Sequence, residues 1–66
     1  MKAKDFVKSR MPTARAERQT TRGKQSYWLI REGRETMWFA DGNTESNAWM
    51  NAKKRILEIE AERERE

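Results

Sequence analysis

The first apolar pattern of the chain lies in residues 1–11. Phe6, Val7 and Met11 recur at helical spacing and form a small apolar edge. Pro12 disfavours the helical conformation for the residue before it, so the sequence predicts a short helix that stops at Met11. A helix of this length needs support from the rest of the fold.

Residues 13–20 carry two competing signals. Ala14 and Ala16 alternate with Arg15 and Glu17, which is typical of a strand, whereas alanine and arginine intrinsically favour a helix. We favour a strand because Pro12 precedes this segment and a loop over residues 21–24 follows it.

Residues 25–40 contain two aromatic, β-favouring runs, at 27–30 and 37–40. Between them, Gly33-Arg34 suits a two-residue type II′ turn, because glycine readily adopts the positive φ that this turn requires. A hairpin closed there would pair Ile30 with Met37 and Trp28 with Phe39.

The predicted hairpin has two different faces, because paired residues share a face and neighbours alternate. One face carries Trp28, Ile30, Met37 and Phe39, and the other carries Tyr27, Leu29, Arg31, Thr36, Trp38 and Ala40. We expect the first face to pack on a helix and the second to meet solvent, although the reverse assignment is also open.

Turn residues 41–43 introduce a long C-terminal helix. Thr44 is a suitable N-cap, and an apolar stripe follows at three- and four-residue spacing. The stripe consists of Ala48, Trp49, Ala52, Ile56 and Ile59. The almost fully charged segment 60–66 is expected to fray or to project into solvent.

These elements predict one α+β domain over residues 1–66 in the order α-β-β-β-α. A three-stranded antiparallel sheet would carry a short N-terminal helix and a long C-terminal helix on one face. A domain of 66 residues has a thin core, so its aromatic side chains should carry much of the packing, and self-association is an alternative source of stability.

The composition argues against several classes of function. The chain has no cysteine and no histidine, so disulfides, thiolate zinc sites and the usual nucleophile–base pairs are absent. Glu32, Glu35 and Asp41 are ordinary turn and hairpin-end carboxylates. We therefore expect a non-enzymatic protein without a metal or another cofactor.

Localisation follows from the same features. The apolar runs are too short to span a membrane, and no apolar stretch follows the basic N-terminus as it would in a signal peptide. The expected location is the cytoplasm, without a membrane partner.

Charge is distributed unevenly along the chain. Residues 1–34 hold ten basic and three acidic side chains, whereas residues 35–66 hold five basic and eight acidic ones. The basic half, with aromatic residues beside it, predicts nucleic-acid binding, to DNA or RNA, through the outer sheet face. The candidate residues are Arg15, Arg18, Arg22, Lys24, Tyr27, Arg31 and Arg34.

The alternative hypothesis is a protein-interaction or self-associating module. Its candidate residues are Tyr27, Leu29 and Trp38, which would form an apolar patch on the outer face. The basic triplet 53–55 is interpreted as the solvated side of the long helix.

Two families resemble this sequence. The segment 39–48, continued by Ala52 and Ile56, is similar to the strand-Gly-x-(Ser/Thr)-x-x-x-Ala-x-x-x-Ala entry of the double-stranded-RNA-binding domain. That resemblance implies the α-β-β-β-α order and RNA binding. The positions that hold lysines in that family are Glu45, Ser46 and Asn47 here, and the 20–24 loop has neither proline nor histidine.

The second resemblance is to the arm-binding domains of phage-type integrases. It rests on the Tyr27-Trp28-x-x-Arg31 strand and on the Thr44-capped, alanine-bearing helix. It implies that the sheet enters the DNA major groove with Arg15, Tyr27, Arg31 and Arg34 facing the DNA. The short, basic, cysteine-free chain also resembles small phage or prophage accessory proteins.

Overall fold

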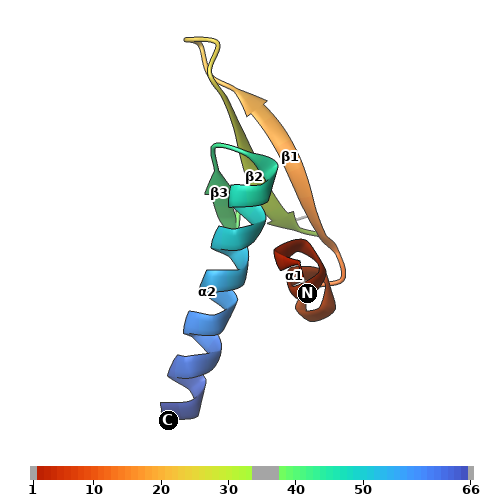
Figure 1. Cartoon of the computed structure of the whole chain (residues 1–66), viewed down its shortest axis with the longest axis vertical. Coiled ribbons are helices and arrows are strands. Elements are labelled where there is room, and N and C mark those ends of the chain that lie inside the picture. Colours follow the sequence, from red (N-terminus) through yellow and green to blue (C-terminus); the bar gives the residue numbers. More distant parts are fainter. Residues whose placement is uncertain (1, 34–37, 66) are drawn as a thin grey trace.

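The computed structural model describes residues 2–33 and 38–65, and it has the predicted α-β-β-β-α order. The elements are α1 (Ala3–Arg10), β1 (Ala14–Thr20), β2 (Ser26–Glu32), β3 (Ala40–Gly42) and α2 (Glu45–Arg65). The strands form one antiparallel sheet in the order β1-β2-β3. Figure 1 shows an elongated molecule, 43 × 25 × 20 Å, with the β1–β2 hairpin at one end and the C-terminal part of α2 at the other.

Helix α1 ends where the sequence predicts. Its last turn closes through the Met11 N–H, which donates to the Val7 carbonyl at 2.7 Å, and Pro12 prevents a further turn. Val7 and Met11 are buried and Phe6 is half-buried, so the small apolar edge anchors α1 on the domain.

Strand β1 forms over 14–20, which confirms the strand interpretation of this segment. It pairs with β2 over seven residues, from Ala14 opposite Glu32 to Thr20 opposite Ser26. Tertiary pairing therefore overrides the helix propensity of its alanines and arginines.

The predicted register of the second hairpin is wrong. Ile30 pairs with Ala40 and Trp28 pairs with Gly42, three residues later than a turn at Gly33-Arg34 requires. Gly33 does have a positive φ of 57°, whereas Thr36, Met37 and Arg34 lie outside the described residues. Asp41 and Gly42, predicted as turn residues, belong to β3.

Close packing of β3 on α2 explains the shift. A Cβ atom on Gly42 would lie 2.5 Å from the Ala48 nitrogen, so only glycine fits opposite the first turns of α2. An aromatic residue at this place would displace the helix. The small residues Ala40 and Gly42 therefore occupy the strand, and the bulkier Trp38 and Phe39 precede it.

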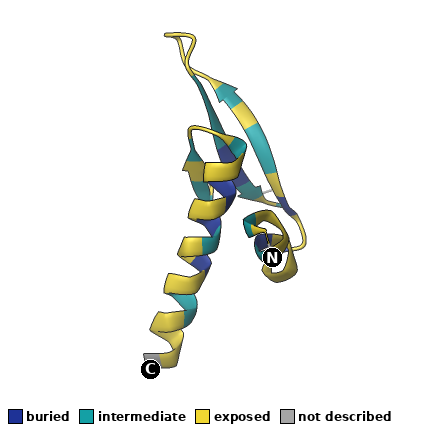
Figure 2. Cartoon of the chain, viewed as in Figure 1, coloured by how far each residue is buried: buried dark blue, intermediate teal, exposed yellow. Residues whose placement is uncertain are grey.

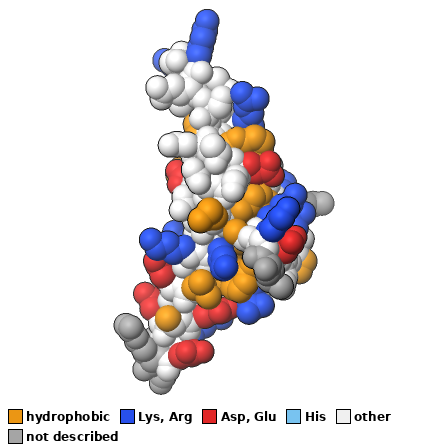
Figure 3. All heavy atoms as spheres, in the orientation of Figure 1, with side chains coloured by type: hydrophobic (Ala, Val, Ile, Leu, Met, Phe, Trp, Pro, Cys, Tyr) orange, Lys and Arg blue, Asp and Glu red, His pale blue; other side chains and the backbone are white. Residues whose placement is uncertain are grey.

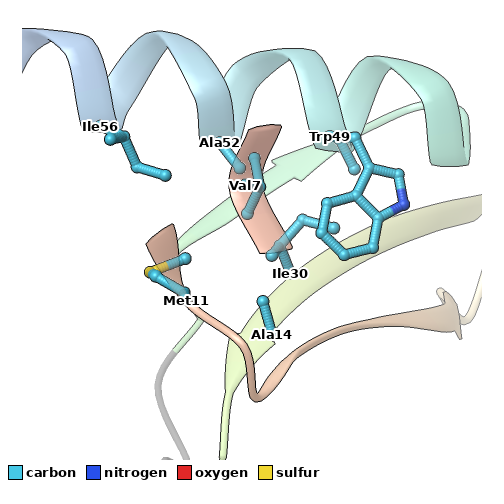
Figure 4. Packing of buried hydrophobic residues seen from close by; sticks show 8 residues of the cluster. Val7, Met11, Ala14, Ile30, Trp49, Ala52 and Ile56 are labelled. Atoms are coloured by element: carbon cyan, nitrogen blue, oxygen red, sulfur yellow. The ribbon is translucent and has the colours of Figure 1, made fainter. Parts of the chain in front are cut away.

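The inner face of the sheet carries the core (Figure 4). As predicted, Trp28 and Ile30 face the helices, and Phe39 packs against the core as well. Ala40 was assigned to the outer face and lies on the inner one, because it pairs with Ile30. The buried cluster consists of Val7, Met11, Ala14, Ile30, Ala48, Trp49, Ala52 and Ile56.

Helix α2 begins at the predicted cap, since the Asn47 N–H donates to Thr44 Oγ1 at 3.1 Å. The predicted stripe forms its buried side, which Figure 2 shows as a dark band along one side of the helix. Of the two alternatives for the charged segment 60–66, fraying or projection into solvent, the structure has the second for its described residues, because the helix continues to Arg65 and residues 61–64 are exposed. Glu60 bonds to Arg10 of α1 at 3.0 Å, which ties this part of the helix to the domain.

Candidate nucleic-acid interface

The outer half of the β1–β2 hairpin projects beyond both helices (Figure 1). We call residues 18–28 the distal ribbon. All six residues from Thr20 to Gln25 at its tip are exposed. The ribbon is therefore a two-stranded arm that is open to a partner on several sides.

A defined turn closes the tip. The Lys24 N–H donates to the Thr21 carbonyl at 3.0 Å, and the Thr21 N–H donates to the Gln25 carbonyl at 2.9 Å. The Gln25 N–H also donates to Thr21 Oγ1 at 3.2 Å. Lys24 has a φ of +63°, a conformation in which glycine is usually found. The backbone thus holds a lysine in a strained conformation at the point of the ribbon.

All the charged side chains of the distal ribbon are basic. It carries Arg18, Arg22 and Lys24, and no acidic residue occurs between Glu17 and Glu32. Three ion pairs join described residues, and none of them includes these cations. Arg18 instead donates to Ser26 Oγ across the hairpin at 3.0 Å. Figure 3 shows basic side chains at the far end of the molecule, where a phosphate backbone could reach them.

The two arginines nearer the domain share one carboxylate. Glu17 accepts from Arg15 Nε at 2.9 Å and lies 3.3 Å from Arg31 Nε, so one carboxylate bridges both guanidinium groups. Arg15 also donates to the Gly33 carbonyl. Asp41 is paired with Leu29 in the same row across the sheet as Glu17. This part of the outer face therefore has balanced formal charge and offers little attraction to phosphate.

The predicted basic residues thus separate into two groups. Arg18, Arg22 and Lys24 lie on the distal ribbon, whereas Arg15 and Arg31 belong to the Glu17 cluster. Tyr27 lies opposite Gln19, half-buried, on the outer face. Arg34 lies outside the described residues.

The alternative apolar patch is only partly assembled. Leu29 shares the outer face with Tyr27 but is only 5% exposed, and Tyr27 is half-buried. Trp38 is 56% exposed and precedes β3, so strand pairing does not fix the face it occupies. Of these three residues, Trp38 alone offers a large accessible apolar surface.

Sequence reasoning missed two features. The Thr21 side chain accepts a hydrogen bond that orders the ribbon tip. A threonine at the start of a four-residue turn is the sequence signal that could have predicted this role. Met50 and Leu57 are exposed on α2, and their seven-residue spacing on the polar side of the helix was the signal for them.

Residues 2–33 and 38–65 contain no cluster of three potential metal ligands. In the same ranges no helix combines the length and the apolar character needed to cross a bilayer.

No protein-family model, curated protein or solved structure matches this chain.

Substituting Lys24 should affect stability and binding in opposite directions. Lys24→Gly relieves the left-handed strain and should raise the free energy of unfolding by about 0.5–1 kcal/mol. It also removes one cation, so affinity for duplex DNA should fall about 8-fold at 0.1 M salt. Urea unfolding and DNA titration measure the two effects. Lys24→Ala is the matched control, which should lose the affinity without gaining stability.

Proposed function

We propose that this protein is a non-enzymatic, duplex-DNA-binding accessory protein whose distal ribbon enters the major groove. The observation that carries the proposal is the projecting two-stranded arm with three cations and no acidic side chain. Phosphate attraction supplies most of the affinity of such contacts, and it requires cations that are not already paired within the protein.

The shape of the ribbon supports duplex DNA as the ligand. Paired strands lie about 4.8 Å apart, and the B-DNA major groove, about 12 Å wide, admits a two-stranded ribbon. The major groove of A-form RNA is deep and narrow, so the same ribbon fits it poorly. The first turn of α2 carries Glu45 and no lysine, which also favours the ribbon over the helix as the binding element.

The side chains of the ribbon suggest a division of roles. Arg22 and Lys24 at the tip would contact phosphates, with Arg18 beside them on the inner face. Gln19 and Tyr27 form a cross-strand pair on the face that no helix covers. Glutamine can bond the adenine edge, and the tyrosine ring can pack against bases or sugars. The resemblance to integrase arm-binding domains also implies a sheet in the major groove with Tyr27 near the DNA, but it uses Arg15, Arg31 and Arg34, whereas the mode proposed here uses the ribbon tip.

The salt dependence of binding to a labelled duplex tests the proposal. Three neutralised phosphates give a slope of about −2.7 in log affinity against log salt, or about 40-fold weaker binding at 200 mM than at 50 mM salt. Anisotropy titrations with duplex DNA, duplex RNA and single-stranded DNA provide the measurement. Absence of duplex-DNA binding at low salt would overturn the proposal, and so would a preference for duplex RNA.

A further inference from the structure

The side of α2 that faces away from the sheet carries an apolar stripe. Met50 is 58% exposed and Leu57 is 46% exposed. They are seven residues apart, and Ala61, four residues further, continues the same line and is exposed. Beside this stripe, at the seam with α1, lies an open groove of about 420 Å³ that is lined by Ala3, Met50, Lys53, Lys54 and Leu57.

Charge changes sign along this surface. The groove end is basic, with Lys53 and Lys54 on α2 and Lys2 and Lys4 lining the adjoining hollow. The second half of α2 is acidic, because residues 57–65 contain four glutamates and two arginines. The ion pairs between described residues include none of Lys53, Lys54, Glu58 and Glu64.

We infer that this face, Met50, Leu57 and Ala61 with their flanking charges, binds a second copy of the chain through an antiparallel α2–α2 contact. A two-fold interface must be self-complementary, and a helix face that is basic at one end and acidic at the other meets this condition when its copy runs in the opposite direction. An unrelated acidic partner would fit the basic half but would leave the acidic half without a counterpart.

Helix periodicity sets the register. With Leu57 at the two-fold axis, Met50 lies near Ala61 of the second copy, and the small alanine leaves room for the methionine side chain. On one flank Lys54 comes within reach of Glu58 of the second copy, and on the other flank Lys53 comes within reach of Glu64. Glu60 is not needed, since it already bonds to Arg10.

Self-association also adds stability to a domain whose core is thin. A chain of 66 residues buries a limited share of its apolar surface alone, and oligomerisation is one of the means by which small domains gain stability. The contact uses α2 and the α1 seam, whereas the distal ribbon lies at the opposite end of the molecule (Figure 1). Association and DNA binding can therefore be measured separately.

Sedimentation equilibrium on the DNA-free chain tests the inference. The wild type should approach twice 7.9 kDa as its concentration rises to about 500 μM. Leu57→Asp places a charge at the apolar centre of the contact and should raise the dimer dissociation constant by about 30-fold or more. Lys8→Glu, an exposed lysine outside the contact, is the control and should leave the dimer intact.

A charge swap makes the test specific to this register. Lys54→Glu should weaken the dimer, and adding Glu58→Lys in the same chain should restore it, because the pair across the two-fold axis is then reversed. A wild type that stays monomeric overturns the inference. Dimers that Leu57→Asp leaves unchanged also overturn it, because association must then use another surface, such as Trp38.

Discussion

Replacing Arg18, Arg22 and Lys24 together by alanine should weaken binding to duplex DNA by about 500-fold at 0.1 M salt. In the counterion-release description each lost phosphate contact removes about 0.9 from the salt slope, so the slope of the variant should approach zero. The effect is large because these residues are the cations of the distal ribbon, and no acidic residue between 17 and 32 offsets them. Anisotropy titrations at several salt concentrations measure both quantities.

A charge-matched variant separates this effect from a change in overall charge. Lys2, Lys8 and Arg63 are exposed and lie outside the ribbon, and replacing them by alanine removes the same formal charge. This control should retain most of the affinity and most of the slope. Equal losses in the two variants would mean that net charge, rather than the ribbon, governs binding.

Gly42→Ala should have the largest effect on stability. The added Cβ would lie 2.5 Å from the Ala48 nitrogen and 2.8 Å from the Asn47 carbonyl carbon. These are backbone atoms of α2, so the clash cannot be relieved by rotating a side chain. Overpacking of this kind costs about 1–3 kcal/mol, a large part of the roughly 3–5 kcal/mol that a core of this size supplies.

The loss should appear as a lower midpoint in thermal unfolding followed by circular dichroism. Gly23→Ala is the matched control, because its Cβ would have only Thr21 Oγ1 within 4 Å, at 3.8 Å. It should change the free energy of unfolding by less than about 1 kcal/mol. Equal midpoints for the two variants would contradict the close β3–α2 contact.

The elements that local signals determine could be predicted from the sequence. Pro12 sets the end of α1 and Thr44 the start of α2, because both act on the backbone next to them. The buried stripe of α2 follows from its spacing alone. The inward direction of Trp28 and Ile30 also agrees with the prediction, because alternation along β2 holds whichever residues pair with it.

The register of β3 could not be predicted in the same way. Aromatic residues have high strand propensity, which favoured 37–40 over 40–42, but the distance between strand and helix decides the outcome. That distance excludes a side chain at Gly42 and depends on packing between segments remote in sequence. Local propensity does not contain this information.

The candidate site, too, could be predicted only in part from the sequence. Counting charges along the sequence found the basic half, but it gave equal weight to Arg31 and Arg22. The structure separates them, because Glu17 on the paired strand forms an ion pair with Arg31, whereas none of the ion pairs between described residues includes Arg22. Cross-strand pairing, rather than composition, therefore selects the distal ribbon.

The most direct measurement of the central claim is an amide chemical-shift map of the nitrogen-15-labelled protein titrated with a short DNA duplex at low salt. Binding through the distal ribbon predicts that the largest changes fall within residues 18–28 and are centred on Arg22 and Lys24. Residues 46–61 on the exposed side of α2 should change little. Largest changes on α2 or around Arg15 and Arg31, with the ribbon unaffected, would contradict the account.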